Sequence, residues 1–463
     1  MHKGRLARAA ALAMLAQGVS VAVSALTVFL LASALSPSAY GLWQFYLLAG
    51  SFSGLFHLGL CDGVYLRLGG QRYTQLDLPR EGSIFRRMTA IMGVISAVGV
   101  TVTLLEGGME GRGWGIALAL AYMPLFNAVA YLGFVQQATD NTAVYSLSVV
   151  IERLSFGAAV VVTVAAGTQD FRVYAACSIV AKLVALGYLV FKTRRLVLAP
   201  TKMCGVGETV RRDISAGFRL MSANLAGQLT TSAARFAVIY KYGDAAFGKV
   251  SFAMTLSGLF LQFISQLTMV LFPTLRRQDS AGRREAFCRL GRLSRLLLPG
   301  VLLAYLPLKT VITALLPTYS DGMEYLILLL PLCLFDGNVH LVGASYLKVA
   351  GRVGILWRLE LLSAAASLAL CFGAAYVGGG VTGILIAAVA AAVLRSLLFD
   401  AACGEGARLW WQNTAGLAVL ALAFVFAARF LGDVAAMLTY GGLYLCYLGT
   451  TLWRRGGLPA PTK

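Results

Sequence analysis

Apolar runs of about 20 residues recur from one end of the chain to the other, separated by short polar segments. A run of that length crosses the ~30 Å hydrocarbon core of a bilayer as an α-helix, because each residue adds about 1.5 Å. The pattern therefore predicts an all-α polytopic membrane protein with about fourteen transmembrane helices. The predicted spans are Ala9–Leu35, Leu42–Asp62, Phe85–Leu105, Trp114–Val135, Asn141–Ala166, Phe171–Phe191, Ile214–Ile239, Phe247–Leu271, Leu293–Leu316, Met323–Leu347, Val353–Tyr376, Val381–Leu398, Asn413–Phe430 and Val434–Trp453.

The first apolar run follows Lys3, Arg5 and Arg8, as the apolar part of a secretory signal would. It is longer than the ~7–15 residues of such a segment, so we expect a retained first membrane helix. The seventh span is the most polar, since it contains Asn224, Gln228 and Arg235. No other stretch is long enough to form a separate soluble domain.

Composition and charge support the same interpretation. Of the 463 residues, 59% are hydrophobic and 13% charged, whereas soluble domains average roughly 25% charged residues. With the N-terminus inside, the predicted cytoplasmic segments carry 30 of the 39 Lys and Arg residues. This is the usual cytoplasmic bias and predicts that both termini lie in the cytoplasm.

The formal charge of +19 does not indicate nucleic acid as a partner, because the basic residues lie in short loops beside predicted spans. There they set topology and attract anionic lipid heads. The eight cysteines are scattered without a CxxC pair, and the three histidines have no metal-site spacing. We therefore expect no metal and no cofactor, and we interpret the cysteines as small packing residues.

An internal repeat gives the predicted helices an arrangement. Ser38-Ala-Tyr-Gly-Leu-Trp-Gln-Phe45 enters the second span, and Ala245-Ala-Phe-Gly-Lys-Val-Ser-Phe252 enters the eighth, 207 residues later. Six helices per repeat preserve orientation, which predicts two parallel lobes related by an axis along the membrane normal. Transporters built in this way place the substrate path between the lobes.

These segments, with His57-Leu-Gly-Leu-Cys-Asp-Gly63 and Gly217-Phe-Arg-Leu-Met221, give a sequence that resembles the polysaccharide exporters, or Wzx-like flippases. These belong to the multidrug/oligosaccharidyl-lipid/polysaccharide (MOP) exporter superfamily. The resemblance implies MATE-like lobes at residues 1–200 and 201–400, with a terminal helix pair at 401–463. It also implies that the chain moves a polyprenyl-diphosphate-linked oligosaccharide across the cytoplasmic membrane by alternating access. Glycan polymerases or glycosyltransferases would then be possible partners.

Ionisable residues inside membrane helices are costly, and so are candidates for function. Arg153, Lys182 and Arg235 are candidates for binding the anionic head group, because Arg and Lys can bind phosphate oxygens. For Arg153 the alternative is a structural interhelical pair. For Arg235, about a turn from the outer end of its span, the alternative is a side chain that snorkels to the interface, whereas Lys182 lies at a depth from which it cannot easily do so. Glu152 and Arg153 are neighbours about 100° apart on a helix, so each is expected to have its partner elsewhere.

Asp336 and His340 lie four residues apart in the tenth span, which would put them on one helical face. Together with Glu152 they are candidates for coupling transport to an ion. The simpler interpretation of Asp336 and His340 is a polar packing node.

Other functions predict other features. An ion-coupled multidrug antiporter of the same superfamily is the main alternative, and it would be expected to need acidic cavity residues. A membrane-bound sugar polymerase, ligase or glycosyltransferase would need a large outer loop or a cytosolic domain, so we do not expect an enzyme. A non-transporting scramblase or scaffold is compatible with the sequence.

Overall fold

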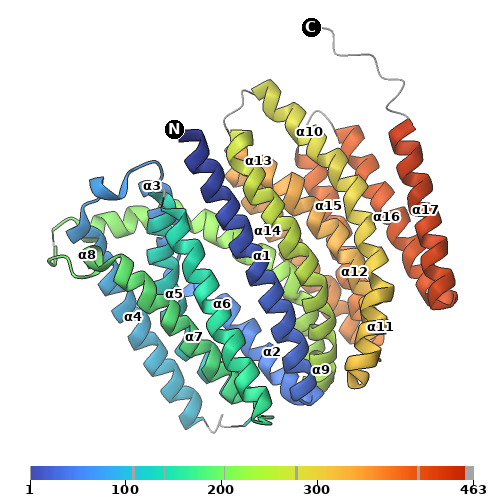
Figure 1. The fold of residues 1–463 in the computed structure, drawn as a ribbon, viewed down its shortest axis with the longest axis horizontal. Helices are drawn as coiled ribbons and strands as arrows, with labels where there is room; N and C mark the ends of the chain where they lie inside the picture. Colours follow the sequence, from blue (N-terminus) through green and yellow to red (C-terminus); the bar gives the residue numbers. More distant parts are fainter. Residues whose placement is uncertain are drawn as a thin grey trace. The chain divides into compact units, whose positions relative to one another are not determined.

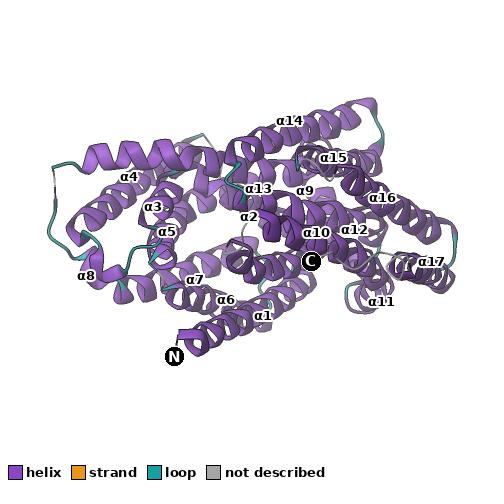
Figure 2. Cartoon of the chain, turned by 90° about the horizontal axis from the view of Figure 1, so that it is seen from above, coloured by secondary structure: helices purple, strands orange, loops and turns teal. Residues whose placement is uncertain are grey.

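The structure is a computed structural model. It describes the backbone of residues 2–106, 110–139, 141–202, 204–276, 280–403 and 407–453, and the side chains of these residues except 2–17, 263–286, 288, 289, 407–413, 452 and 453. The regular structure of this part of the chain is helical throughout, as the sequence predicts (Figures 1 and 2). It divides into two compact units, Met1–Arg235 with Ile239–Ser251, and Phe236–Val238 with Phe252–Lys463.

The first unit contains seven long helices and several short ones. They are α1 (His2–Ala34), α2 (Pro37–Ser51), η1 (Phe52–His57), α3 (Leu60–Leu68), η2 (Tyr73–Gln75), α4 (Leu78–Leu105), α5 (Arg112–Ala138), α6 (Thr142–Ala165), α7 (Phe171–Lys192), α8 (Arg194–Val197) and the first part of α9 (Val206–Arg276). Helix α5 packs against α2, α3, α4 and α7 and is the centre of this unit. By contrast, α4 and α6 leave large apolar side chains such as Val94, Val98 and Val162 exposed.

The second unit contains the rest of α9 and the following helices. They are α10 (Ser280–Leu297), η3 (Leu298–Ala304), α11 (Tyr305–Leu315), η4 (Pro317–Tyr319), α12 (Gly322–Asn338), the π-helix η5 (Val339–Ala344), α13 (Ser345–Val349), α14 (Val353–Val377), α15 (Gly380–Ala402), α16 (Ala407–Phe430) and α17 (Asp433–Trp453). Helix α12 is the buried centre, packed against α15 and α16. A helix that is apolar all round is typical of such a central position.

Each predicted span has a helical counterpart in the structure. Among the described residues, eight helices are long and apolar enough to cross a membrane, or nine if one bent pair forms a single span. Shorter apolar segments, Gly18–Ala34 and Thr414–Phe430, add to these. The helices indicate a multi-pass membrane protein, in agreement with the prediction.

Side-chain caps explain where several helices begin. Ser36 precedes Pro37, and the Ser36 hydroxyl accepts a hydrogen bond from the backbone N–H of Ala39. Asp77 caps α4 in the same way, and Asp170 caps α7. Such caps satisfy N–H groups that have no partner inside the helix. The Lys202 ammonium, 2.7 Å from Asp77, holds the pKa of that carboxyl below its ordinary value.

The second predicted span, Leu42–Asp62, is helical but bent. The chain turns by 60° between η1 and α3. Leu58 and Gly59 both have positive φ, at 51° and 88°, which ends the first helical segment. The bend buries His57, whose Nδ1 accepts a hydrogen bond from the Gly59 N–H and whose Nε2 lies 4.0 Å from Asp62.

Helix α9 consists of two helices that meet at a kink at Gly243, where the backbone is non-helical, with φ 76° and ψ −171°. This is the segment where the sequence predicts the loop between the seventh and eighth spans. Only glycine adopts this backbone conformation readily. Gly243 therefore marks the break between the two helices, at the predicted loop.

The two repeated motifs contact each other within the first unit. A Cβ at Gly41 would lie 2.1 Å from the carbonyl oxygen of Asp244, and one at Gly248 would lie 2.2 Å from that of Pro37. The two glycines occupy equivalent repeat positions, so α2 and α9 approach backbone to backbone. Nearby, the Arg112 guanidinium pairs with Asp244 at 2.7 Å.

A second close approach joins α3 to the beginning of α9. A Cβ at Gly63 would lie 1.9 Å from the Asp213 carbonyl oxygen, and one at Gly217 would lie 2.0 Å from that of Gly59. Glycine is needed at these positions because no side-chain atom fits between the two backbones.

Candidate functional site

A buried ion pair joins α6 to α7 in the first unit. The Lys182 ammonium lies 2.6 Å from a Glu152 carboxylate oxygen, and the two side chains are 8% and 18% exposed. Both residues lie in the middle of long apolar helices, where a lone charge would be strongly disfavoured. The partner that the sequence analysis expected for Glu152 is therefore Lys182.

Aromatic side chains surround this pair. The Lys182 ammonium lies 5.3 Å from the ring centroid of Tyr122 and 5.7 Å from that of Phe126, both on α5. Cations within about 6 Å of a ring face are attracted to the π-electrons. One turn from Lys182, the Ser178 hydroxyl lies 2.6 Å from the Tyr46 hydroxyl. The result is a polar and aromatic cluster at the centre of the unit.

Arg153 is half-buried beside this cluster, and it forms no ion pair with any described side chain. Arg153 and Glu152 both lie near Tyr122 of α5. Two of the predicted substrate-binding residues, Arg153 and Lys182, therefore share the α5–α6–α7 region. Glu152, predicted for ion coupling, is in direct contact with Lys182.

Arg235 lies on α9 and is also half-buried. Its Nε atom is enclosed without a hydrogen-bond partner among the described residues. Arg235 lies near Tyr40 of α2, whose hydroxyl accepts a hydrogen bond from Gln44 at 2.8 Å. Arg235 is therefore associated with the α2 side of the unit, whereas Arg153 and Lys182 are associated with α5.

The second unit contains a fully buried charge cluster centred on Arg395 of α15. The Arg395 guanidinium lies 2.9 Å from Asp336 of α12 and 2.8 Å from Glu360 of α14, and its side chain is 1% exposed. Glu360 Oε2 and Arg395 Nε have no hydrogen-bond partner among the described residues. With both acids ionised, this cluster would carry one net negative charge.

Asp336 and His340 differ in exposure and in partners. Asp336 is buried, whereas His340 is exposed and belongs to η5. Asp336 pairs with Arg395, and no hydrogen bond or ion pair joins it to His340 among the described residues.

Sequence reasoning did not single out Arg395. It lies three residues before the predicted end of its span at Leu398, where a long side chain is expected to reach the aqueous interface. The available signal was an arginine within an otherwise apolar helix, together with carboxylates in the tenth and eleventh spans.

A chain of polar contacts runs through the second unit next to this cluster. Ser294 donates to Asn338 at 3.4 Å, Asn338 donates to Ser396 at 3.2 Å, and the Ser396 and Thr414 hydroxyls lie 2.9 Å apart. Thr414 in turn donates to Asp400. The chain links α10, α12, α15 and α16, and pairing of this kind is what allows buried polar groups to be tolerated.

A third charge cluster fixes the end of α3. Arg67 makes two parallel hydrogen bonds to Glu81 of α4, at 2.8 and 2.9 Å, and contacts Asp213 of α9 at 2.9 Å. The Tyr131 hydroxyl of α5 donates to the same Glu81 carboxylate. Glu81 and Asp213 are almost fully buried. This cluster holds four helices together beside the Gly63–Asp213 approach.

The described residues contain no group of three or more histidine, cysteine or acidic residues placed to hold a metal ion. Four cysteines, Cys61, Cys333, Cys371 and Cys403, are buried, as packing residues would be. Cys204 and Cys446 are exposed.

The protein is similar to known proteins in structure. No protein-family model and no curated protein matches the sequence. The solved inward-facing structure of a multidrug resistance MATE family transporter of the MOP superfamily superimposes with a TM-score of 0.63 and 11% identity. That match covers 88% of this chain and 99% of the other. The lipid II flippase MurJ, in an inward closed conformation, superimposes with a TM-score of 0.69 and 9% identity, covering 96% and 99% of the two chains.

A third structure is a MOP superfamily transporter from Pyrococcus furiosus, described as having a binding pocket of reverse polarity. It matches with a TM-score of 0.52 and 12% identity over 89% of this chain and 96% of that one. The chain has the fold of the MOP transporters. At these identities the likeness is one of fold, and it agrees with the predicted MATE-like, all-α architecture.

Proposed function

We propose that this protein moves a polyprenyl-diphosphate-linked oligosaccharide across the cytoplasmic membrane by alternating access. The observation that carries the proposal is the excess of positive charge within the spans of the first unit. Of the four charged groups predicted there, Arg153, Lys182 and Arg235 are cations and only Glu152 is an anion. Lys182 forms an ion pair with Glu152. None of these four residues therefore supplies a carboxylate to pair with the guanidinium groups of Arg153 and Arg235.

A positive charge without a partner at membrane depth is unfavourable unless an anion or water compensates it. The diphosphate of a lipid-linked sugar is such an anion, and a guanidinium can bind two of its oxygens at once. Aromatic rings such as Tyr122 and Phe126 offer flat apolar faces to a sugar. This charge and ring combination suits an anionic, amphiphilic substrate better than an organic cation.

The extent of the structural match also favours a lipid-linked substrate. The lipid II flippase match covers 96% of this chain, against 88% for the MATE transporter, although each match covers 99% of the other protein. The match with the flippase thus takes in more of this chain than the match with the MATE transporter.

The proposal includes a location and partners. The protein would lie in the cytoplasmic membrane with both termini inside, and a glycosyltransferase or glycan polymerase would supply or consume its substrate. In this proposal, residues 1–200 and 201–400 form the two lobes that move relative to each other during alternating access.

A second candidate is an ion-coupled multidrug antiporter. It is favoured by the Arg395 cluster, because two buried carboxylates against one guanidinium leave a negative charge that a proton or a cation would neutralise. The same cluster could couple flippase transport to protons through Asp336, so it does not decide between substrates. Glu152 and His340 remain the other candidates for coupling.

The test is transport in proteoliposomes containing the purified full chain, with a fluorescent polyprenyl-diphosphate-linked sugar and a cationic dye as parallel probes. Arg153→Ala and Lys182→Ala should each lower flipping of the sugar lipid by roughly 10–100-fold, the range expected when a charged hydrogen bond is lost. Arg153→Lys should recover only part of the activity. Arg172→Ala, at an exposed pair with Asp170, is the matched control and should have no effect.

Two results would contradict the proposal. One is dye transport that exceeds sugar-lipid transport in the unmodified protein, which would favour the antiporter. The other is full flipping by Arg153→Ala and Lys182→Ala. Asp336→Asn, measured with and without an imposed proton gradient, shows whether coupling passes through that residue.

A further inference from the structure

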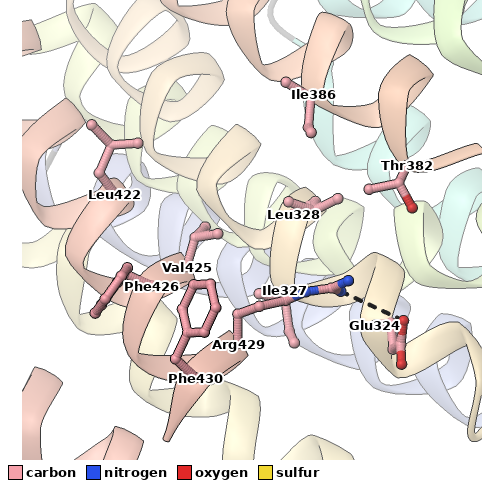
Figure 3. Close-up of a pocket in the computed structure, with 10 residues that line it drawn as sticks. All are labelled: Glu324, Ile327, Leu328, Thr382, Ile386, Leu422, Val425, Phe426, Arg429 and Phe430. Atoms are coloured by element: carbon pink, nitrogen blue, oxygen red, sulfur yellow. Dashed lines mark ion pairs between the residues drawn. The ribbon is translucent and has the colours of Figure 1, made fainter. Parts of the chain in front are cut away.

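Two cavities adjoin at one end of the second unit, where α12, α15 and α17 begin and α11 and α16 end. The first, of about 490 Å³, lies among α12, α15 and α16 (Figure 3). Its walls are mainly apolar, formed by Leu422, Val425 and Phe426 of α16, Ile386 of α15 and Ile327 of α12. The predicted topology places this end of the helices on the outer side of the membrane.

This cavity is open along its side. Leu422, Phe426 and Ile386 are 70%, 64% and 54% exposed, although they line the cavity. In Figure 3, Leu422 and Phe426 project from α16 on one side, and Ile386 projects from α15 on the other. An apolar groove that opens on the lipid-facing surface suits an alkyl chain entering sideways from the bilayer.

The second cavity, of about 470 Å³, is polar and shares Glu324, Ile327 and Arg429 with the first. Its other polar walls come from Lys309 and Thr313 of α11 and from Ser320 and Asp321. The Arg429 guanidinium, at the junction, points toward Glu324 (Figure 3). The two cavities together form one amphipathic site, in which an apolar groove adjoins a polar chamber.

The charges around the chamber indicate the class of head group. Lys309 is paired with Asp433 at 2.6 Å, so its charge is already neutralised. Arg429 and Glu324 are 3.6 Å apart and 51% and 70% exposed, a loose pair that a ligand can separate. One positive and one negative group are thus left to bind a ligand, which matches a zwitterionic head better than a diphosphate or any other strongly anionic head.

We propose that this site binds a zwitterionic aminophospholipid of the phosphatidylethanolamine type. Its phosphate would contact Arg429, its ammonium would contact Glu324, and one acyl chain would occupy the groove along Leu422 and Ile386. Each half of the Arg429–Glu324 pair would thus exchange its partner for the matching charge on the lipid. The proposal does not depend on which substrate the protein transports.

The first test is native mass spectrometry of the delipidated full chain titrated with palmitoyl-oleoyl phosphatidylethanolamine, phosphatidylcholine or phosphatidylglycerol. Phosphatidylethanolamine should bind about tenfold more tightly than the other two, because only its primary ammonium both carries charge and donates hydrogen bonds to carboxylates. Equal binding of the three lipids, or a preference for phosphatidylglycerol, would overturn the proposal.

The second test separates the groove from the rest of the lipid-facing surface. Leu422→Trp fills the groove, whereas Val419→Trp changes a residue of the same helix that is similarly exposed, at 66%, and does not line the cavity. Leu422→Trp should weaken phosphatidylethanolamine binding about tenfold or more, the scale of losing much of a buried chain's apolar contact, and Val419→Trp should not. Equal effects of the two variants would show binding to the general surface only.

The third test removes charge. Glu324→Gln should abolish the preference for phosphatidylethanolamine over phosphatidylcholine, and Arg429→Gln should weaken the binding of both lipids. Asp170→Asn, at an exposed pair of the first unit, is the matched control. An unchanged preference in Glu324→Gln would remove the assigned role of that carboxylate and with it the proposed site.

Discussion

Two of the charged side chains in the membrane spans, Lys182 and Arg395, are paired with carboxylates on other helices. Lys182 uses a carboxylate on α6 and two aromatic rings on α5, and Arg395 uses carboxylates on α12 and α14. A guanidinium with two carboxylates is stable in a low-dielectric interior only if its geometry and hydrogen bonds are nearly complete. Removing one charged residue of such a cluster therefore lowers the free energy of unfolding by more than the intact ion pair adds to it.

Arg395 supplies a residue-scale prediction. Arg395→Met should destabilise the protein by about 3–5 kcal/mol, because Asp336 and Glu360 would be left buried without a counter-charge. The measurement is the thermal unfolding midpoint of the purified full chain in detergent. Arg172→Met, at an exposed pair, is the control and should leave the midpoint unchanged.

A triple variant tests the same cluster by restoring charge balance. Asp336→Asn with Glu360→Gln and Arg395→Met leaves no buried charge there, so it should recover most of the lost stability. A single Arg395→Met variant as stable as the unmodified protein would contradict the assignment of this cluster as a buried ion network.

At the scale of helices, glycine decides how closely neighbouring segments pack. Helix α9 approaches α3 at Gly63 and α2 at Gly41, each time with backbone in contact with backbone. The ion pairs Arg67–Asp213 and Arg112–Asp244 lie beside the two approaches. Close packing and charge pairing thus fix the same two points of α9.

Gly63→Ala should lower stability by about 1–3 kcal/mol or more, because the added methyl group overlaps the Asp213 carbonyl and would force α3 and α9 apart. Gly187→Ala is the matched control in the interior of α7, where a Cβ would meet nothing within 4 Å. The control should gain about 0.5–1 kcal/mol from reduced backbone entropy. Unfolding midpoints of the two variants provide the measurement, and equal midpoints would show that the α3–α9 approach is not needed.

At the scale of the whole molecule, the distribution of basic residues predicts the topology, with both termini inside. In a background without native cysteines, Thr168→Cys should react with a membrane-impermeant maleimide in intact cells. Gln71→Cys and Arg284→Cys should react only after permeabilisation. External labelling of the segment Arg276–Arg295 would contradict fourteen spans in this orientation.

The positions of the helices were predictable from hydrophobicity alone. Lipid offers no hydrogen bonds, so each membrane segment satisfies its own backbone as a helix, and its ends can be recognised where polar residues resume. Span ends such as Leu105 and Phe430 agree with the structure. Even the polar seventh span is helical, because hydrogen bonds within the helix do not depend on its side chains.

The partners of the charged residues could not be read in the same way. Lys182 and Glu152 lie 30 residues apart, and Arg395 and Asp336 lie 59 apart, so their contacts depend on how the helices pack. The same is true of the bend at Leu58 and Gly59, which brings Gly59 against Gly217.

The sequence by itself therefore determined which segments are helices and which charges lie within them, because hydrophobicity and backbone hydrogen bonding act locally along the chain. Only the tertiary structure decided which charges neutralise one another, because that depends on contacts between helices distant in sequence.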